Sequence, residues 1–152
     1  MNIVLHQPEI PHNTGAIGRT CLMTGTSLHL IRPYGFYLDE KSLTRSGLDY
    51  WPQLGVHEYD SFPHFLEKNP RACFYLVETG GGLFYTDVEY KTDDYIIFGS
   101  ETCGLPRWLL DEYPERVVSI PMAGAKRSLN LSVAAGIVLY EALRQNGFTG
   151  MT

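Results

Sequence analysis

Short apolar runs alternate with helical patterns along the chain, and this alternation predicts a sheet covered by helices. Runs that read as strands are rich in β-branched and aromatic residues and are bounded by glycine, proline or polar clusters. They cover Asn2–His6, Ser27–Ile31, Val56–Tyr59, Ala72–Val77, Tyr95–Phe98 and Val117–Ile120. Helical periodicity covers Thr14–Thr24, Phe62–Lys68 and Pro106–Glu112, with a shorter helix expected near Lys41–Gly47.

Several of these strands are apolar at consecutive positions, as in Phe74–Val77 and Tyr95–Phe98. Such strands are buried on both faces, which is typical of a parallel sheet with helices on each side. We therefore expect an α/β fold with a mostly parallel sheet flanked by helices. The 152 residues contain no repeat or linker and 44% are hydrophobic, so a single domain over 1–152 is expected.

The last helix is expected to begin after Asn130, a good N-cap residue, and to run to Gln145. For three turns it has almost no polar face, which indicates burial on every side. Two interpretations follow: the helix forms a dimer interface, or it lies unusually deep in a single chain. Ser132, Ala134, Ala135 and Gly136 would permit close approach of a neighbouring backbone.

The composition narrows the class of protein. No apolar run approaches the length of a membrane span, and the first residues lack the pattern of a signal peptide. Three cysteines without a CxxC pair and five histidines without metal spacing favour free thiols, no metal site and a cytoplasmic location. A net charge of −5 argues against broad nucleic-acid binding, so any basic patch must be local.

Three segments contain residues that a functional role would explain better than a purely structural one. In the first, Asn13–Arg19, Gly15 and Gly18 share one helix face, which indicates a close neighbour there. Arg19 beside that face either extends to solvent or points into a site.

The second segment is Phe98–Pro106, where a buried strand ends in Gly99 and a polar turn precedes a helix. Ligands of open α/β sheets bind at such carboxyl ends of strands, although an ordinary loop capped by Glu101 is the alternative. The third, Ile120–Ser132, contains a basic loop in which Lys126 and Arg127 either bind phosphate or form an exposed surface pair. The run Gly80–Gly82 does not continue into a dinucleotide-binding motif.

In this order and spacing, the three segments resemble the SPOUT superfamily of RNA methyltransferases, and the resemblance extends over nearly the whole chain. Within it, the opening NIVLHQPEIPHNTG and the segment Gly47–Tyr50 are most similar to the minimal tRNA wobble-nucleotide 2′-O-methyltransferases. The resemblance implies a deep trefoil knot at the carboxyl end, a homodimer and S-adenosyl-L-methionine as cofactor.

It also implies roles for individual residues. The catalytic set would be Arg19, supported by Asn13 and Glu101, and Tyr140 would lie in the dimer interface. Paired chains would bring basic residues together for RNA, among them Arg45, Lys126 and Arg127. The cofactor set would be Leu76, Val77, Glu78, Thr79, Gly99, Ile120, Met122, Ser128 and Asn130.

The expected reaction is methylation of the ribose 2′-hydroxyl of cytidine or uridine 34 in tRNA, with leucine tRNAs as the expected substrates. The alternatives are methylation of another RNA position or of rRNA, and an RNA-binding module without catalysis. Because a guanidinium rarely gives up its proton, Arg19 is expected to stabilise a developing oxyanion or to hold a phosphate, not to act as a base.

Overall fold

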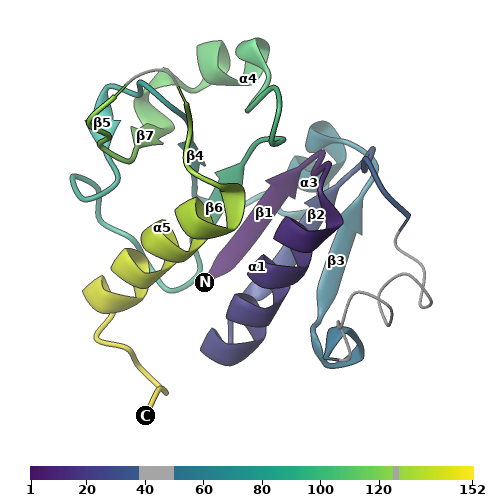
Figure 1. Ribbon diagram of the computed structural model, residues 1–152. Coiled ribbons are helices and arrows are strands. Elements are labelled where there is room, and N and C mark those ends of the chain that lie inside the picture. The colour runs from purple at the N-terminus through teal and green to yellow at the C-terminus, as the bar shows by residue number, and fades with distance from the viewer. Residues whose placement is uncertain (38–49, 125–126) are drawn as a thin grey trace.

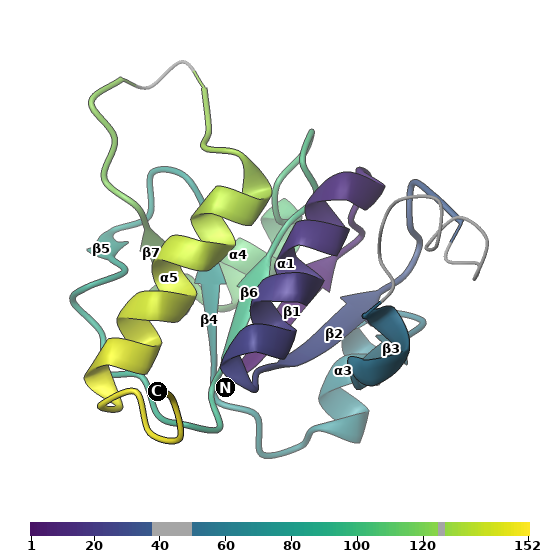
Figure 2. The ribbon, with the colours of Figure 1, turned by 60° about the horizontal axis from the view of Figure 1, so that its bottom comes forward.

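The computed structural model describes residues 1–37, 50–124 and 127–152, which form a seven-stranded sheet with helices on both faces (Figures 1 and 2). The sheet order is β3-β2-β1-β6-β4-β7-β5, and every paired strand runs parallel to its neighbour. Its strands are β1 (Asn2–His6), β2 (Ser27–Ile31), β3 (Val56–Tyr59), β4 (Phe74–Val77), β5 (Leu83–Phe84), β6 (Tyr95–Phe98) and β7 (Val117–Ser119).

In the described part of the chain, two helices cover each face of the sheet. On one face lie α1 (Pro11–Thr24) and α5 (Leu131–Gln145), and on the other lie α3 (Phe62–Lys68) and α4 (Arg107–Glu112). Because side chains alternate along a strand, Ile3 and Leu5 of β1 pack under α1 and α5, whereas Val4 packs toward α3 and α4. Single-turn 3-10 helices occupy Trp51–Gln53 and Pro114–Arg116.

The predicted α/β class and parallel sheet are confirmed, and the bounds of six elements match the structure: Asn2–His6, Ser27–Ile31, Val56–Tyr59, Phe62–Lys68, Tyr95–Phe98 and Leu131–Gln145. Other bounds were wrong. Helix α1 begins at Pro11 and not at Thr14, because proline fits the first helical position and needs no N–H partner there.

At the remaining sites the elements are shorter than predicted. Strand β4 starts at Phe74 instead of Ala72, β7 ends at Ser119 instead of Ile120, and α4 starts at Arg107 with Pro106 as its N-cap. Strand β5 was missed altogether. The predicted helix near Lys41–Gly47 lies outside the described residues.

A close neighbour of the α1 glycines was predicted, and it is present. A Cβ on Gly18 would lie 2.9 Å from a methyl carbon of Leu54 and 3.1 Å from the ring of Trp51. The carbonyl of Gly15 accepts a hydrogen bond from the hydroxyl of Tyr50. The segment before β3 therefore packs directly on the backbone of α1, and the close approach at Gly18 explains the glycine there.

Helix α5 is not deep in its own chain. Its buried side is made of Ala135, Val138, Leu139, Ala142 and Leu143. On the other side, Val133 is 49% exposed and Tyr140 is 50% exposed. Val133 and Tyr140 therefore leave apolar surface exposed at two positions of one face of α5. Among the described residues, no helix has the length and apolar character that crossing a membrane requires.

A buried histidine links stability to pH. The ring of His29 is 4% exposed; its Nδ1 lies 2.9 Å from the Tyr59 hydroxyl and its Nε2 lies 3.2 Å from Oδ1 of Asn2. The Asn2 oxygen can only accept, so Nε2 carries the proton of a neutral ring. Burial, with the nearby His57 adding to it, lowers the pKa of His29 to about 3.

Acidification is expected to destabilise the protein through this group. Below the ordinary histidine pKa, this histidine binds a proton in the unfolded chain but not in the folded one. Its contribution to the free energy of unfolding is therefore fully present above that pKa and is lost as the pH falls. The loss reaches roughly 2 kcal/mol between pH of about 6.5 and about 5. Chemical denaturation across this range should show a shallower slope in His29→Gln. A residual slope is expected, because burial also lowers the pKa of His6. Identical slopes in the two proteins would contradict the assignment.

Candidate functional site

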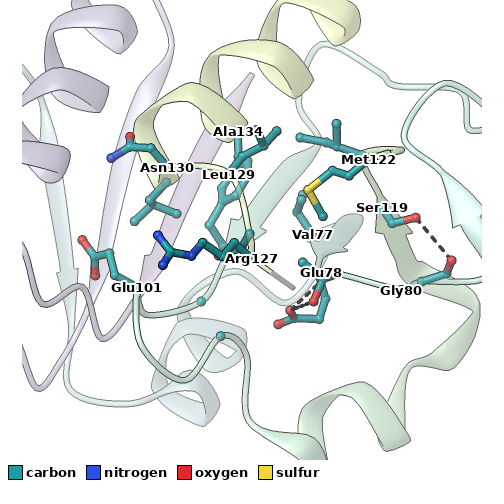
Figure 3. A pocket seen from close by; sticks show the side chains of 18 of the residues that line it. Val77, Glu78, Gly80, Glu101, Ser119, Met122, Arg127, Leu129, Asn130 and Ala134 are labelled. Atoms are coloured by element: carbon teal, nitrogen blue, oxygen red, sulfur yellow. Dashed lines mark hydrogen bonds between the residues drawn. The ribbon is translucent and has the colours of Figure 1, made fainter. Parts of the chain in front are cut away.

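A cavity of about 1120 Å³ opens at the carboxyl ends of β4, β6 and β7, between the loops that follow these strands and the start of α5 (Figure 3). This is the edge where parallel α/β sheets bind ligands. Exposed apolar side chains line part of it: Ile10, Phe84, Met122 and Leu129. Of the predicted cofactor and supporting residues, the cavity is lined by Asn13, Val77, Glu78, Thr79, Gly99, Glu101, Ile120, Met122, Ser128 and Asn130.

Leu76 is the one predicted cofactor residue that does not line the cavity. Its side chain is fully buried and packs with Phe62, Phe65 and Leu109 beneath α3 and α4. The cause is the alternation of side chains along β4, which turns Leu76 into the core and leaves Val77 facing the other way.

A chain of hydrogen bonds joins three loops at one end of the cavity. The Glu101 carboxylate accepts from the backbone N–H of Glu9 at 2.8 Å, from that of Ile10 at 3.1 Å and from Nδ2 of Asn13 at 3.1 Å. The Asn13 oxygen accepts in turn from Nδ2 of Asn130 at 3.0 Å. Asn13, 5% exposed, thus uses both ends of its amide, so its orientation is fixed by its two partners.

Asn130 extends this chain into α5. Its oxygen accepts from the N–H groups of Ser132, at 2.9 Å, and Val133, at 3.4 Å. These are N–H groups that the first turn of a helix leaves without an intrahelical partner. The predicted cap is therefore confirmed, and the same residue that begins α5 also binds the start of α1.

Glu78 forms part of the opposite wall. Its carboxylate accepts from the N–H of Leu105 at 2.8 Å and from the N–H of Thr79 at 2.8 Å. Gly104 adopts φ +68°, and a Cβ there would lie 2.5 Å from Oε2 of Glu78. Glu78 therefore holds the β6–α4 loop in place, and Gly104 is required both by its conformation and by the carboxylate beside it.

The predicted basic residues are placed differently from one another. Arg127 lines the cavity together with Glu78 and Glu101 (Figure 3). Arg19 is exposed on α1 and does not line it. Within the part of the chain that the structure describes, neither arginine has an ion-pair partner. Arg45 and Lys126 lie outside the described residues.

Sequence reasoning missed two parts of the site. Phe84 is 50% exposed and lines the cavity from β5, a strand of two residues that gives no periodic signal. Thr102 lines it from the β6–α4 loop, where its partner, Glu9, is distant in sequence. The complete arrangement, with apolar walls and polar groups at both ends, suits a ligand that has a flat apolar ring and polar termini.

Comparison with known proteins identifies the class. Residues 1–140 match the model of the SpoU rRNA methylase family. The chain therefore belongs to this family of methylases, in agreement with the resemblance of its motifs.

The relatives are similar over their whole length. A tRNA (cytidine(34)-2′-O)-methyltransferase of Escherichia coli K12 is 47% identical, covering 99% of this chain and 96% of that protein. A protein of the same name from Yersinia pestis is 44% identical, covering 99% of this chain and 96% of that one.

Two solved structures have the same fold. One, from a study of 2-OH methylation of C/U34 on tRNA, has a TM-score of 0.88 and 44% identity, covering 96% of this chain and 95% of that one. The SpoU methyltransferase AviRb of Streptomyces viridochromogenes, in complex with AdoMet, has a TM-score of 0.83 and 27% identity, covering 96% of this chain and 57% of that one.

Two glycines that line the cavity test its geometry. A Cβ on Gly99 would lie 2.0 Å from the backbone carbon of Gly104, whereas a Cβ on Gly124 would have no heavy atom within 4 Å. Gly99→Ala is therefore expected to displace the β6–α4 loop and to weaken S-adenosylmethionine binding by at least about tenfold in calorimetric titration, whereas Gly124→Ala should bind nearly as wild type. Equal affinity in the two variants would contradict a cofactor role for this cavity.

Proposed function

We propose that this protein transfers a methyl group from S-adenosyl-L-methionine to the ribose 2′-hydroxyl of cytidine or uridine 34 in tRNA, with leucine tRNAs as its substrates. The observation that carries the proposal is the cavity at the carboxyl ends of β4, β6 and β7, because eight of the nine predicted cofactor residues line it. Membership in a methylase family and the names of relatives near half identity support the same reaction.

The residues present fit this cofactor. Val77, Ile120, Met122 and Leu129 offer an apolar surface to an adenine ring, and the loops that contain Gly99 and Ser128 offer backbone groups to its polar edges. About 1120 Å³ exceeds what one small ligand needs, so there is room for part of a nucleotide beside it. When bound, the cofactor supplies a methyl group on a positively charged sulfur.

The chain must make a weakly acidic hydroxyl reactive. The ribose oxygen gains the methyl carbon while the carbon–sulfur bond breaks and the hydroxyl proton leaves to solvent. We assign Arg19 to stabilise the negative charge that develops on this oxygen, or to hold the adjacent phosphate. Asn13 and Glu101 support Arg19 indirectly, because their hydrogen bond fixes the start of α1, the helix that carries Arg19.

A homodimer would complete the site. Val133 and Tyr140 lie seven residues apart on α5, so they share one helix face, and both are about half exposed. Covering this face with a second copy would bury both side chains. It would also bring the exposed Arg19 and Arg127 near one groove, and we propose Arg45 and Lys126 as further RNA-binding residues. A basic groove of this kind reconciles RNA binding with a net charge of −5.

We further propose that the chain is a single domain over 1–152 with a trefoil knot at its carboxyl end. In the sheet, β7 lies between β4 and β5, although β4 and β5 are consecutive in the chain. The hydroxyl of Ser119, at the end of β7, donates to the carbonyls of Gly81 and Leu83 in the segment that leads into β5. This arrangement supports passage of the last segment through the loop formed by residues 78–94. A tRNA substrate also implies work in the cytoplasm.

The reaction is tested by transfer of labelled methyl groups from S-adenosylmethionine to tRNA taken from cells that lack the protein. We expect label at ribose 34 and a loss of about 10²–10³ in rate for Arg19→Ala, the typical cost of removing one preorganised donor. If Arg19 stabilises charge, Arg19→Lys should retain part of the rate without a new titration in its pH–rate profile. Label in rRNA or at another tRNA position would contradict the assigned substrate, and absence of transfer to any RNA would favour a non-catalytic module.

The dimer is tested by a charge at the exposed face of α5. Tyr140→Glu would bury a carboxylate without a partner, so it is expected to convert a dimer to monomers in light scattering at micromolar concentration, with methyl transfer lost as well. Lys68→Glu, an exposed substitution on α3 of the opposite sheet face, is the matched control and should stay dimeric. A wild-type monomer, or a dimer unaffected by Tyr140→Glu, would contradict this interface.

A further inference from the structure

The β1–α1 segment and the β6–α4 loop are joined by hydrogen bonds in both directions, and a glutamate of each segment accepts from donors of the other. Glu101, in the loop, accepts from the N–H groups of Glu9 and Ile10. In the opposite direction, the Glu9 carboxylate accepts from the N–H of Thr102 at 2.9 Å and from the hydroxyl of Thr102, which lies 2.8 Å from both of its oxygens. Each segment therefore supplies both a carboxylate and backbone donors to the other.

The backbone of Glu9 is also held from its other side. The N–H of Gly35 donates to the carbonyl of Pro8 at 2.9 Å, and a Cβ on Gly35 would lie 2.8 Å from Cα of Glu9. Just before this point, Gln7 adopts φ +54°, a conformation that is uncommon for a residue with a side chain. Glu9 thus sits on a backbone whose path is fixed by the segment after β2, and its carboxylate can act as a rigid acceptor for Thr102.

The two partners of this exchange belong to different parts of the site. Thr102 and Glu101 line the cavity from the β6–α4 loop. Glu9 precedes Ile10, the N-cap of α1, and α1 carries Arg19. Glu78 holds the far end of this loop through the N–H of Leu105, but Glu101 alone would join the loop to the start of α1 through a single carboxylate. Bonds in both directions instead fix the orientation of the loop relative to α1, as charge-assisted and multiply bonded contacts do.

We propose that Glu9 and Thr102 are positioning residues for methyl transfer. Their contact fixes the β6–α4 loop, which lines the cavity, relative to α1, which carries Arg19. The methyl donor in the cavity and the arginine therefore keep one relative position. This inference rests on the proposed function. It assigns no contact with substrate to either residue, and it explains why an acidic residue precedes α1 without serving as its cap: the N-cap is Ile10, and no side chain caps the helix.

Three variants at Thr102 and Glu9, with one control at Ser100, isolate the contact. Thr102→Val keeps the shape of the side chain and removes the hydroxyl, whereas Thr102→Ser keeps the hydroxyl. Ser100→Ala is the control for disturbing the loop itself, because Ser100 lines the cavity from the same loop. Its hydroxyl accepts from the N–H of Cys103 and, among the described residues, has no bond to Glu9. Glu9→Gln removes one acceptor oxygen and presents an amide N–H₂ to the Thr102 donors.

The kinetic readout is kcat for methyl transfer at saturating tRNA and cofactor, set against the cofactor Kd. We expect Thr102→Val and Glu9→Gln each to lower kcat about tenfold with Kd changed less than about threefold, because misplacement costs rate more than binding. Thr102→Ser should restore kcat, and the double variant Glu9→Gln/Thr102→Val should lose no more than the worse single variant. Equal losses for Thr102→Val and Thr102→Ser, additive losses in the double variant, or an equal loss in Ser100→Ala would overturn the proposal.

A second readout does not depend on activity. Amide hydrogen exchange is followed at Glu9 and Ile10 with and without S-adenosylhomocysteine. The product should slow exchange at these amides in wild type and Thr102→Ser, and should slow it much less in Thr102→Val. Equal protection in all three would overturn the coupling. A wild type that methylates no RNA but shows this difference would overturn the proposed function and still support the coupling.

Discussion

The hydrogen bonds that Asn13 donates to Glu101 and that Asn130 donates to Asn13 set the geometry on which the rest of the site depends. They join residues 88 and 117 positions apart in the chain. Each partner is also a structural element of its own loop: Asn13 lies in the first turn of α1, Glu101 holds the backbone before α1, and Asn130 caps α5. The two helices on one face of the sheet therefore begin at fixed positions relative to the β6–α4 loop, and the cavity has its shape because these starts cannot move independently.

The distribution of charge follows from the same arrangement. The two carboxylates in the cavity, Glu78 and Glu101, are occupied by N–H groups of their own chain, so they act as structural acceptors inside an acidic protein. The arginines Arg19 and Arg127 are exposed and have no ion-pair partner among the described residues. Glu78 and Glu101 are thus used inside the protein, whereas Arg127 in the cavity wall and Arg19 on α1 are exposed and available to a phosphate of the proposed RNA substrate. A negative net charge is compatible with an RNA substrate when the charges are sorted in this way.

Local signals were sufficient for the framework of the fold and insufficient for its contacts. Apolar runs located β1, β2, β3, β6 and α3 to the residue, and Asn130 marked the start of α5, because propensity, burial and capping act over a few neighbouring residues. The start of α1 was placed at Thr14 instead of Pro11, although proline suits the first helical position, and the amide of Asn13 in this first turn bonds to Glu101 and Asn130. Strand β5, the cavity position of Phe84 and the pair Glu9–Thr102 depend on pairings between distant segments. For Glu9 and Thr102 the separation is 93 positions, and no local pattern encodes it. The cofactor set came from motif resemblance, and eight of its nine residues line one cavity. The ninth, Leu76, does not, because strand alternation turns its side chain into the core.

The most direct measurement is a crystal structure of the protein with S-adenosylhomocysteine. We expect the product between the loops that follow β4, β6 and β7, with its adenine against Val77, Ile120 and Met122 and with the Glu101–Asn13–Asn130 hydrogen bonds unbroken. Binding of the product elsewhere on the chain, or in this cavity with Glu101 released from Asn13, would contradict the account.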